Sequence, residues 1–185
     1  MCVCYSSIPH SFNLPVEARL LSDVTVRLIT DQERQRHDQL MEEEHYLGNS
    51  NAIGQVLRYV AEHKGQWVGA LTFCSSSLHL KPRDRLLGWD ADMVRERRHL
   101  IAQNSRFLIL PSTGHWPNLA SKILKLVCQR LYDDWLNQFG TPVLLVETFV
   151  DPQRFKGTCY KSAGWVALGE TKGYARRGRD FYDNT

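Results

Sequence analysis

The chain has 185 residues, of which 43% are hydrophobic and 23% charged. This length suits one domain, since domains typically hold roughly 100–200 residues, and the composition excludes a disordered chain, a collagen-like repeat and a coiled coil. No apolar run approaches the ~20 residues of a bilayer span, which excludes a transmembrane protein. The first ten residues lack the basic and apolar regions of a signal peptide, so we expect a cytoplasmic location.

Charge and cysteine content indicate little about partners. The formal charge is +3, from 23 basic and 20 acidic residues, which is too small to indicate nucleic acid by itself. Of the five cysteines, only Cys2 and Cys4 lie close together, and no C-x-x-C or paired-histidine spacing accompanies them. We therefore expect reduced thiols rather than a disulfide framework, and no metal.

The first half of the chain predicts two helices and several strands after an aperiodic lead-in segment, 1–22. The expected elements are a strand at 24–29, a polar helix at 31–43 opened by a Thr30–Glu33 capping box, a strand hairpin of 55–61 and 66–73, an irregular stretch at 75–88 and a charged helix at 90–103.

The second half alternates strands and helices, which favours a mostly parallel α/β arrangement. The expected elements are a strand at 106–110, a helix capped by Asn118 and ended by Gly140, a strand at 142–149, a short helix between Asp151-Pro152 and Gly164, and a strand at 165–168. The long helix has the clearest pattern, with one apolar face formed by Leu119, Ile123, Leu126, Val127, Leu131 and Trp135.

Two units could carry chemistry. The long helix follows a strand and a loop, and its N-terminus could bind an anion such as pyrophosphate, or it could simply be a core helix. Glu147 lies near the carboxyl end of an apolar strand, where open α/β sheets place ligands. Tyr160 on the next helix could give a proton to a leaving group while Glu147 accepts one from an attacking amine. A buried structural tyrosine and a surface carboxylate are the alternatives.

The segment from Tyr160 to Trp165 resembles the Tyr-x-x-x-Gly-aromatic segment of GNAT-fold N-acyltransferases, and the element order is similar to theirs. The resemblance implies an α/β fold over 23–171, with a mixed sheet and a helical insertion before the fourth strand. It also implies an acyl donor, acetyl-coenzyme A or another, and an amine acceptor. The donor arm would lie along Phe107, Leu108, Ile109 and Leu110, and its phosphates at Asn118, Leu119, Ala120 and Ser121. In that loop only Ala120 suits close approach, and Pro117 removes one N–H donor.

A second resemblance covers most of the chain from about residue 42 and is to the DruA family. It rests on the motifs at 43–48, 88–90, 104–111, 118–121, 133–135, 147–152, 155–160 and 169–171. The family name implies Druantia anti-phage systems, and members also occur beside or fused to transposases. The resemblance places His45 in a shared motif, so Glu44 and His45 join Glu147 and Tyr160 as candidate catalytic residues. A solvated helix end is the alternative for Glu44 and His45.

The last segment, 172–185, is expected to be a basic tail. Arg176, Arg177 and Arg179 lie in it together with Tyr174 and two glycines, which suits an arm that binds phosphates or, equally, a frayed terminus.

Two hypotheses for the function of the whole chain follow. The leading one is a group-transfer enzyme that moves an acyl group from a coenzyme A-type or aminoacyl donor to an amine, either a small molecule or a nucleobase. The rival is a nucleic-acid-binding accessory protein with a degenerate pocket.

Overall fold

A computed structural model describes residues 20–50, 52–78, 80–113, 116–171, 174–177 and 180–183. Its main sheet contains five strands in the order β1-β2-β3-β4-β5. They are β1 (Val24–Leu28), β2 (Val56–His63), β3 (Gln66–Ser75), β4 (Ile101–Ile109) and β5 (Leu145–Thr148). The first four are antiparallel and β5 pairs parallel to β4, which confirms the mixed sheet.

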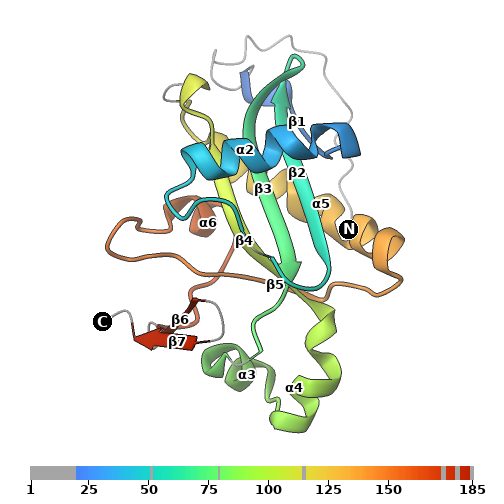
Figure 1. The fold of residues 1–185 in the computed structure, drawn as a ribbon, viewed down its shortest axis with the longest axis vertical. Helices are drawn as coiled ribbons and strands as arrows, with labels where there is room; N and C mark the ends of the chain where they lie inside the picture. The colour runs from blue at the N-terminus through green and yellow to red at the C-terminus, as the bar shows by residue number, and fades with distance from the viewer. Residues whose placement is uncertain are drawn as a thin grey trace, which may run out of the picture.

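Helices cover both faces of this sheet (Figure 1). One face carries α2 (Arg34–Glu44), preceded by the 3-10 turn η1 (Asp31–Glu33), and the other carries the long helix α5 (Leu119–Phe139). The predicted insertion before the fourth strand consists of α3 (Lys81–Leu87), α4 (Ala91–Arg97) and the 3-10 turn η2 (Arg98–Leu100). The remaining elements are the 3-10 turn η3 (Pro111–Thr113), α6 (Thr158–Ser162) and a separate hairpin of β6 (Tyr174–Arg177) and β7 (Asp180–Asp183).

The apolar faces of the two helices explain this layering. The predicted face of α5 is confirmed, since its residues are buried apart from the half-buried Leu126. Between α5 and the sheet lies the larger core cluster, which includes Tyr59, Leu71, Phe73 and Trp135. A smaller cluster forms under α2 from Met41, Val60, Trp67, Ala70, Leu108 and Leu110. The capping box from Thr30 to Glu33 also forms, and it starts the chain into α2.

The charged helix expected at 90–103 is wrong in its last part. Asp90 caps α4 by accepting the Met93 N–H at 2.8 Å, but the helix ends at Arg97 and β4 begins at Ile101. Ile101 and Ala102 are completely buried in the sheet, between β3 and β5. Burial in the sheet therefore outweighs the helical pattern of the charged residues before it.

Four further expectations differ from the structure. The stretch expected to be irregular contains α3, and 165–168 forms no strand. Asn118 precedes α5 with a positive φ of 61° and makes no side-chain cap, because the usual capping geometry needs extended backbone. Asp151 accepts the Gln153 N–H and closes a turn, whereas α6 begins only after Gly157. Apart from these four, the described residues of the expected tail form the paired strands β6 and β7.

One buried histidine makes the stability of the fold depend on pH. His37 on α2 is fully buried, with Nε2 3.2 Å from the Leu71 carbonyl oxygen, and burial lowers its pKa. The unfolded chain therefore binds more protons at this site, so stability is full above the ordinary histidine pKa and falls as pH drops below it. We expect the free energy of unfolding to decrease from pH 7.5 to pH 5.

Urea unfolding at the two pH values, on the wild type and on His37→Gln, measures this dependence. Glutamine can still donate to the Leu71 carbonyl but does not titrate, so the variant should lose part of the difference between the two pH values. Part should remain, because the pKa of His45 is also lowered, to about 4. An unchanged difference in His37→Gln would contradict the assignment.

Candidate functional site

The fourth and fifth strands separate partway along their length. They pair over only four positions, from Ile101–Leu145 to Asn104–Thr148. β5 then ends, whereas β4 continues beside β3 as far as Ile109. Among the described strands, none pairs with the far edge of β4 beyond Asn104. The sheet is therefore open along half of β4.

A β-bulge lies where the strands part. Thr72 of β3 pairs with Arg106 and the next residue, Phe73, pairs with Asn104, so Ser105 is an extra residue in β4. A bulge of this kind bends the strand and strengthens its twist. It turns the second half of β4 away from the line of β5.

The backbone groups of β4 beyond the bulge point alternately to β3 and to the open edge. The Leu110 N–H donates to the Val68 carbonyl at 3.0 Å. Because backbone groups alternate in direction along a strand, those of Leu108 and Leu110 face β3 and those of Phe107 and Ile109 face the open edge. Of the four residues that the GNAT resemblance implies, two thus present main-chain donors and acceptors to the gap.

Tyr160 lies where the two strands separate. It extends from α6, is half-buried, and its hydroxyl donates to Asn104 Oδ1 at 2.8 Å and lies 3.5 Å from Thr148 Oγ1. Its ring packs edge-on against Phe107 and Trp165. Burial raises the pKa of Tyr160 to about 12, so the phenol holds its proton at neutral pH. It can act as an acid in the gap between the strands.

A cavity of about 210 Å³ opens at the N-terminus of α5. It is lined by residues from the start of α5 and from α6: Trp116, Asn118, Leu119, Ala120, Ser121, Thr158, Cys159 and Ser162. The N–H groups of Ala120 and Ser121 belong to the first helical turn, where no carbonyl within the helix is available to them. This volume is many times the ~10–15 Å³ that a single water molecule needs, so the cavity has room for more than solvent alone. It contains the predicted phosphate-loop residues, Asn118 to Ser121, with a hydroxyl-bearing helix opposite.

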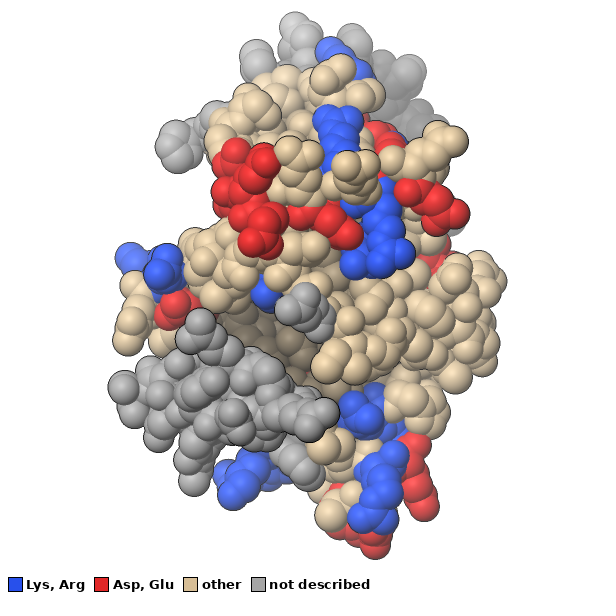
Figure 2. Space-filling view, viewed as in Figure 1, with Lys and Arg blue, Asp and Glu red and all other residues tan. Residues whose placement is uncertain are grey.

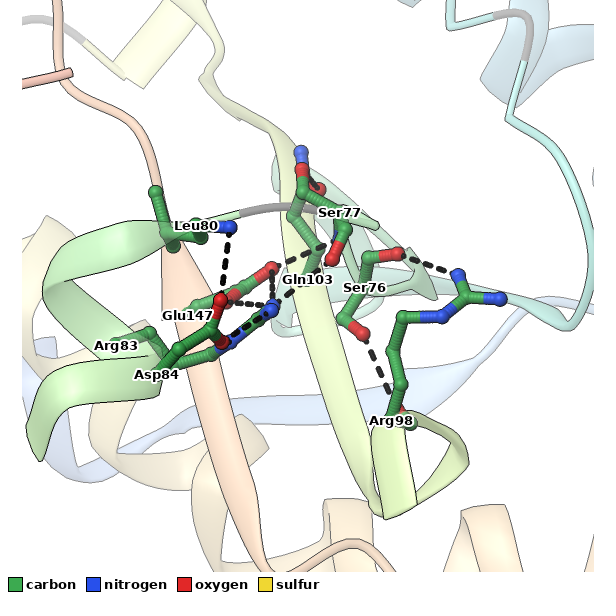
Figure 3. Close-up of polar contacts among 8 residues, drawn as sticks. All are labelled: Ser76, Ser77, Leu80, Arg83, Asp84, Arg98, Gln103 and Glu147. Atoms are coloured by element: carbon green, nitrogen blue, oxygen red, sulfur yellow. Dashed lines mark hydrogen bonds and ion pairs between the residues drawn. The ribbon is translucent and has the colours of Figure 1, made fainter. Parts of the chain in front are cut away.

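Glu147 lies on the other face of the sheet from Tyr160, since it precedes Thr148 in β5 and neighbours in a strand point to opposite faces. It is only 7% exposed, and its carboxylate is bound by Arg83 from the inserted helix α3 (Figure 3). Arg83 Nη1 donates to Glu147 Oε2 at 3.0 Å, and the Ser77 N–H donates to Oε1 at 2.9 Å. Burial raises the pKa of Glu147 while Arg83 opposes that shift.

Arg83 itself has no exposed surface. It also donates to the Ser77 carbonyl at 2.9 Å and pairs with Asp84. A second arginine of the insertion, Arg98, donates to the Ser76 carbonyl, and the Ser76 hydroxyl donates to the Arg98 carbonyl (Figure 3). These contacts fix the inserted helices to the end of β3 and to β5. Glu147 therefore connects the insertion to the strand that also carries Thr148.

His45 lies on the α2 side of the sheet, directly after α2. Its Nδ1 accepts the Leu47 N–H at 3.2 Å, and burial together with the charge of Arg106 lowers its pKa to about 4, so it is neutral at pH 7. Arg106 donates from β4 to the Gly48 carbonyl at 2.8 Å. The loop after α2 is thereby held against the bulged strand.

Figure 2 shows a hollow on this face below α2, with acidic side chains gathered over the helix. The last turn of α2 contributes three exposed glutamates, Glu42, Glu43 and Glu44. Glu42 accepts the Asn49 N–H at 2.8 Å and so orders the loop, whereas Glu44 is exposed to solvent. The structure thus brings Tyr160 to the strand gap and places His45 beside the bulge. Glu147 lies with the insertion, and Glu44 lies on the surface.

Sequence reasoning missed four residues that shape this site: Arg83, Asn104, Arg106 and Thr148. Two signals were available: the polar run Asn104-Ser105-Arg106 ahead of an apolar strand, since asparagine is depleted in strands, and the family motifs at 104–111 and 147–152. For the tail, Arg179 lies outside the described residues, and only the backbone of Arg176 and Arg177 is described. Nucleic-acid binding through the tail stays a prediction.

Cys74, Cys128 and Cys159 are free thiols, while Cys2 and Cys4 lie outside the described part of the chain. Within the described ranges, no group of three His, Cys, Asp or Glu side chains is arranged to hold a metal ion. Nor does any helix in those ranges combine the length and apolar character needed to cross a membrane.

The fold defined by this sheet is that of GNAT acyltransferases. The structure of aminoglycoside acetyltransferase AAC(6′)-Iy with a bisubstrate analogue matches with a TM-score of 0.55, at 12% sequence identity, over 83% of this chain and 98% of that one. That of AAC(6′)-Ib with paromomycin and acetyl-coenzyme A has a TM-score of 0.51 at 16% identity, covering 84% and 85%. An aminoglycoside acetyltransferase from an uncultured soil metagenomic sample has a TM-score of 0.50 at 10% identity, covering 84% and 97%.

Within that fold class, the chain belongs to the DruA family. Residues 15–182 match the family described as Druantia protein DruA. A comparison with curated proteins found no match. The family resemblance expected from the sequence motifs is therefore confirmed, as is the GNAT-like mixed sheet with its helical insertion.

Proposed function

We propose that the protein is an acyltransferase that moves an acyl group from an acyl-coenzyme A donor to an amine. The observation that carries this proposal is the gap between β4 and β5, with the Tyr160 hydroxyl at the point where the strands part. On one side of the gap lie the backbone groups of Phe107 and Ile109, which pair with none of the described strands. Near α6, which carries Tyr160, lies the cavity at the N-terminus of α5.

The residues present fit such a donor. The first-turn N–H groups of Ala120 and Ser121 and the positive end of the α5 dipole suit a diphosphate. The open edge of β4 suits an amide-containing arm, since it offers both N–H and C=O groups. When bound, the donor supplies a thioester whose acyl carbon gains a bond to the amine nitrogen and loses its bond to sulfur. Tyr160 would give its proton to the departing thiolate, and the proton that the amine nitrogen loses would pass to solvent, from which the phenolate regains one.

The acceptor would approach from the α2 face, where the hollow lies (Figure 2). Neutral His45 is the candidate on this side to contact the amine, and exposed Glu44 would favour a cationic acceptor near it. Glu147 would have an indirect role, because its carboxylate is bound by Arg83 and so holds the inserted helices in place beside the acceptor's approach. The acceptor is proposed as a small-molecule amine or a nucleobase. One of the similar structures is an aminoglycoside acetyltransferase in complex with coenzyme A and kanamycin, so kanamycin is a suitable first probe.

The family suggests the setting of this reaction. Because the chain belongs to the DruA family, named for Druantia, we propose that acyl transfer serves defence against phage in the cytoplasm. A donor-binding measurement is the first test, since it does not require that the acceptor be known.

Calorimetry with acetyl-coenzyme A tests donor binding directly. We expect the wild type to bind and Ala120→Glu to bind at least about tenfold more weakly, because a carboxylate in the first turn repels a diphosphate and competes for its site. Gln129→Glu is the matched control, since it adds the same charge to an exposed position farther along α5. It should bind like the wild type. No heat of binding in the wild type, or equal affinities in the two variants, would contradict the proposal.

A further inference from the structure

The bulged strand contains a residue, Asn104, whose side chain connects the β-bulge to the Tyr160 hydroxyl. Asn104 is 3% exposed and is the last β4 residue that pairs with β5. Its Nδ2 donates to the Arg106 carbonyl at 2.9 Å and to the Thr72 carbonyl at 3.2 Å. Both amide protons are therefore used on the bulge. The side-chain oxygen is left to face Tyr160, which it does at 2.8 Å.

The proton of Tyr160 has one acceptor in this arrangement. Thr148 is the other polar neighbour, but its hydroxyl proton goes to the Asn104 carbonyl at 3.0 Å, and its distance to the phenol oxygen is 3.5 Å. An amide oxygen accepts a hydrogen bond from a neutral phenol and repels a phenolate. Asn104 therefore favours the protonated form of Tyr160 and holds it at the point where the strands part.

No charged neighbour competes with this hydrogen bond. The titratable groups that act on Tyr160 are Tyr46, Cys128 and Cys159, and the pKa of each is raised, mainly by burial. All three are neutral near pH 7. The local polarity around the phenol thus comes from Asn104 and Thr148.

We propose that Asn104 is the positioning residue of the acyl-transfer site, because a single amide both donates to the Thr72 and Arg106 carbonyls at the β-bulge and accepts from the Tyr160 hydroxyl where the strands part. The proposal rests on the acyl-transfer function for its meaning, but the hydrogen bond itself can be tested without a donor. The β-bulge and the Tyr160 hydroxyl are then connected through Asn104. The bend that opens the sheet therefore also determines where the phenol proton lies.

The first experiment follows the ionisation of Tyr160 by ¹⁹F NMR with 3-fluorotyrosine, whose phenol is more acidic than that of tyrosine. Tyr160→Phe assigns the resonance. Asn104→Leu removes the acceptor at similar volume, and ionisation should move to lower pH by roughly one unit. Asn104→Asp keeps an acceptor and makes it anionic, so ionisation should move to higher pH. Thr148→Val, the control, should shift it less than either.

The opposite directions of the two shifts keep the test independent of stability, since Asn104→Asp alone is decisive if Asn104→Leu does not fold. Absence of both shifts, or shifts in the same direction, would overturn the proposal. Acetyl-coenzyme A binding is measured on the same samples and should change less than about twofold in Asn104→Leu, because Asn104 does not line the α5 cavity. Failure of the wild type to bind acetyl-coenzyme A would count against the acyl-transfer function but not against the hydrogen bond.

A second experiment separates positioning from a merely structural role. Release of free thiol from acetyl-coenzyme A, with water as acceptor, is measured for Asn104→Leu alone and in the Tyr160→Phe background. If Asn104 acts through the hydroxyl, the substitution should lower turnover about tenfold in the first case and less than twofold in the second. Equal losses in both backgrounds would show that Asn104 matters only for the strand.

Discussion

Replacing Arg83 with methionine should destabilise the protein by about 3–5 kcal/mol, because it leaves the carboxylate of Glu147 buried without its partner. Arg83 has no exposed surface, and Glu147 is 7% exposed. The pKa of Glu147 is already raised by burial, and it should rise further without the guanidinium. A carboxyl whose folded pKa is raised favours folding at low pH and less so as pH increases. The loss should therefore be smaller at pH 5 than at pH 8.

Urea unfolding at the two pH values measures this effect. Arg95→Met is the matched control, since Arg95 lies on the other inserted helix and its ion pair with Asp92 is exposed, so less than about 1 kcal/mol should be lost. Adding Glu147→Gln to Arg83→Met should restore a large part of the stability, because no buried charge then remains. An Arg83 variant as stable as the Arg95 variant would show that the pair is not buried as described.

Removing the hydroxyl of Tyr160 should lower turnover by about 100-fold or more, which is the range for loss of a general acid. The phenol carries its proton at neutral pH and lies in the gap between β4 and β5. Tyr160→Phe keeps the ring and its edge-on contacts with Phe107 and Trp165, so the fold should be retained. Thiol release from acetyl-coenzyme A, with water and with kanamycin as acceptors, provides the rate.

The same measurement on Tyr132→Phe controls for loss of a tyrosine hydroxyl, because Tyr132 is 46% exposed on α5. Its rate should equal that of the wild type. Donor affinity should stay within about twofold in both variants, since neither hydroxyl lines the cavity at the α5 N-terminus. If Tyr160→Phe retained most of its rate, the proton for the leaving thiolate would have to come from another group or from water.

The fold was largely predictable because its main signals are local. The apolar face of α5, the capping box before α2 and Gly140 after Phe139 each follow from spacings within a few residues, and all three form as expected. The start of β4 was not predictable in this way. Ile101 and Ala102 join the sheet because strands on both sides bury them, and that information lies in distant parts of the chain.

The candidate site was predictable only where a reactive side chain lies within a short, recognisable sequence motif. Tyr160 stands in a motif with Gly164, so the sequence could single it out. Arg83 is 64 residues from Glu147, and nothing near either residue indicates the pair. Asn104 is informative only once the bulge is known, because its amide protons go to the Thr72 and Arg106 carbonyls beside that bulge.

The open edge of β4 should select ligands by the spacing of their polar groups. Phe107 and Ile109 face the gap and are two residues apart, so their backbone groups repeat at about 6.6–6.8 Å along the strand. A molecule in the gap must carry polar groups at that interval, or one N–H or C=O loses its partner at a cost of about 1–3 kcal/mol. The choice among donors would then depend on the spacing of amides in the arm more than on the acyl group. A thioester on a carrier too short to provide amides at that interval would therefore bind poorly, whatever its acyl group.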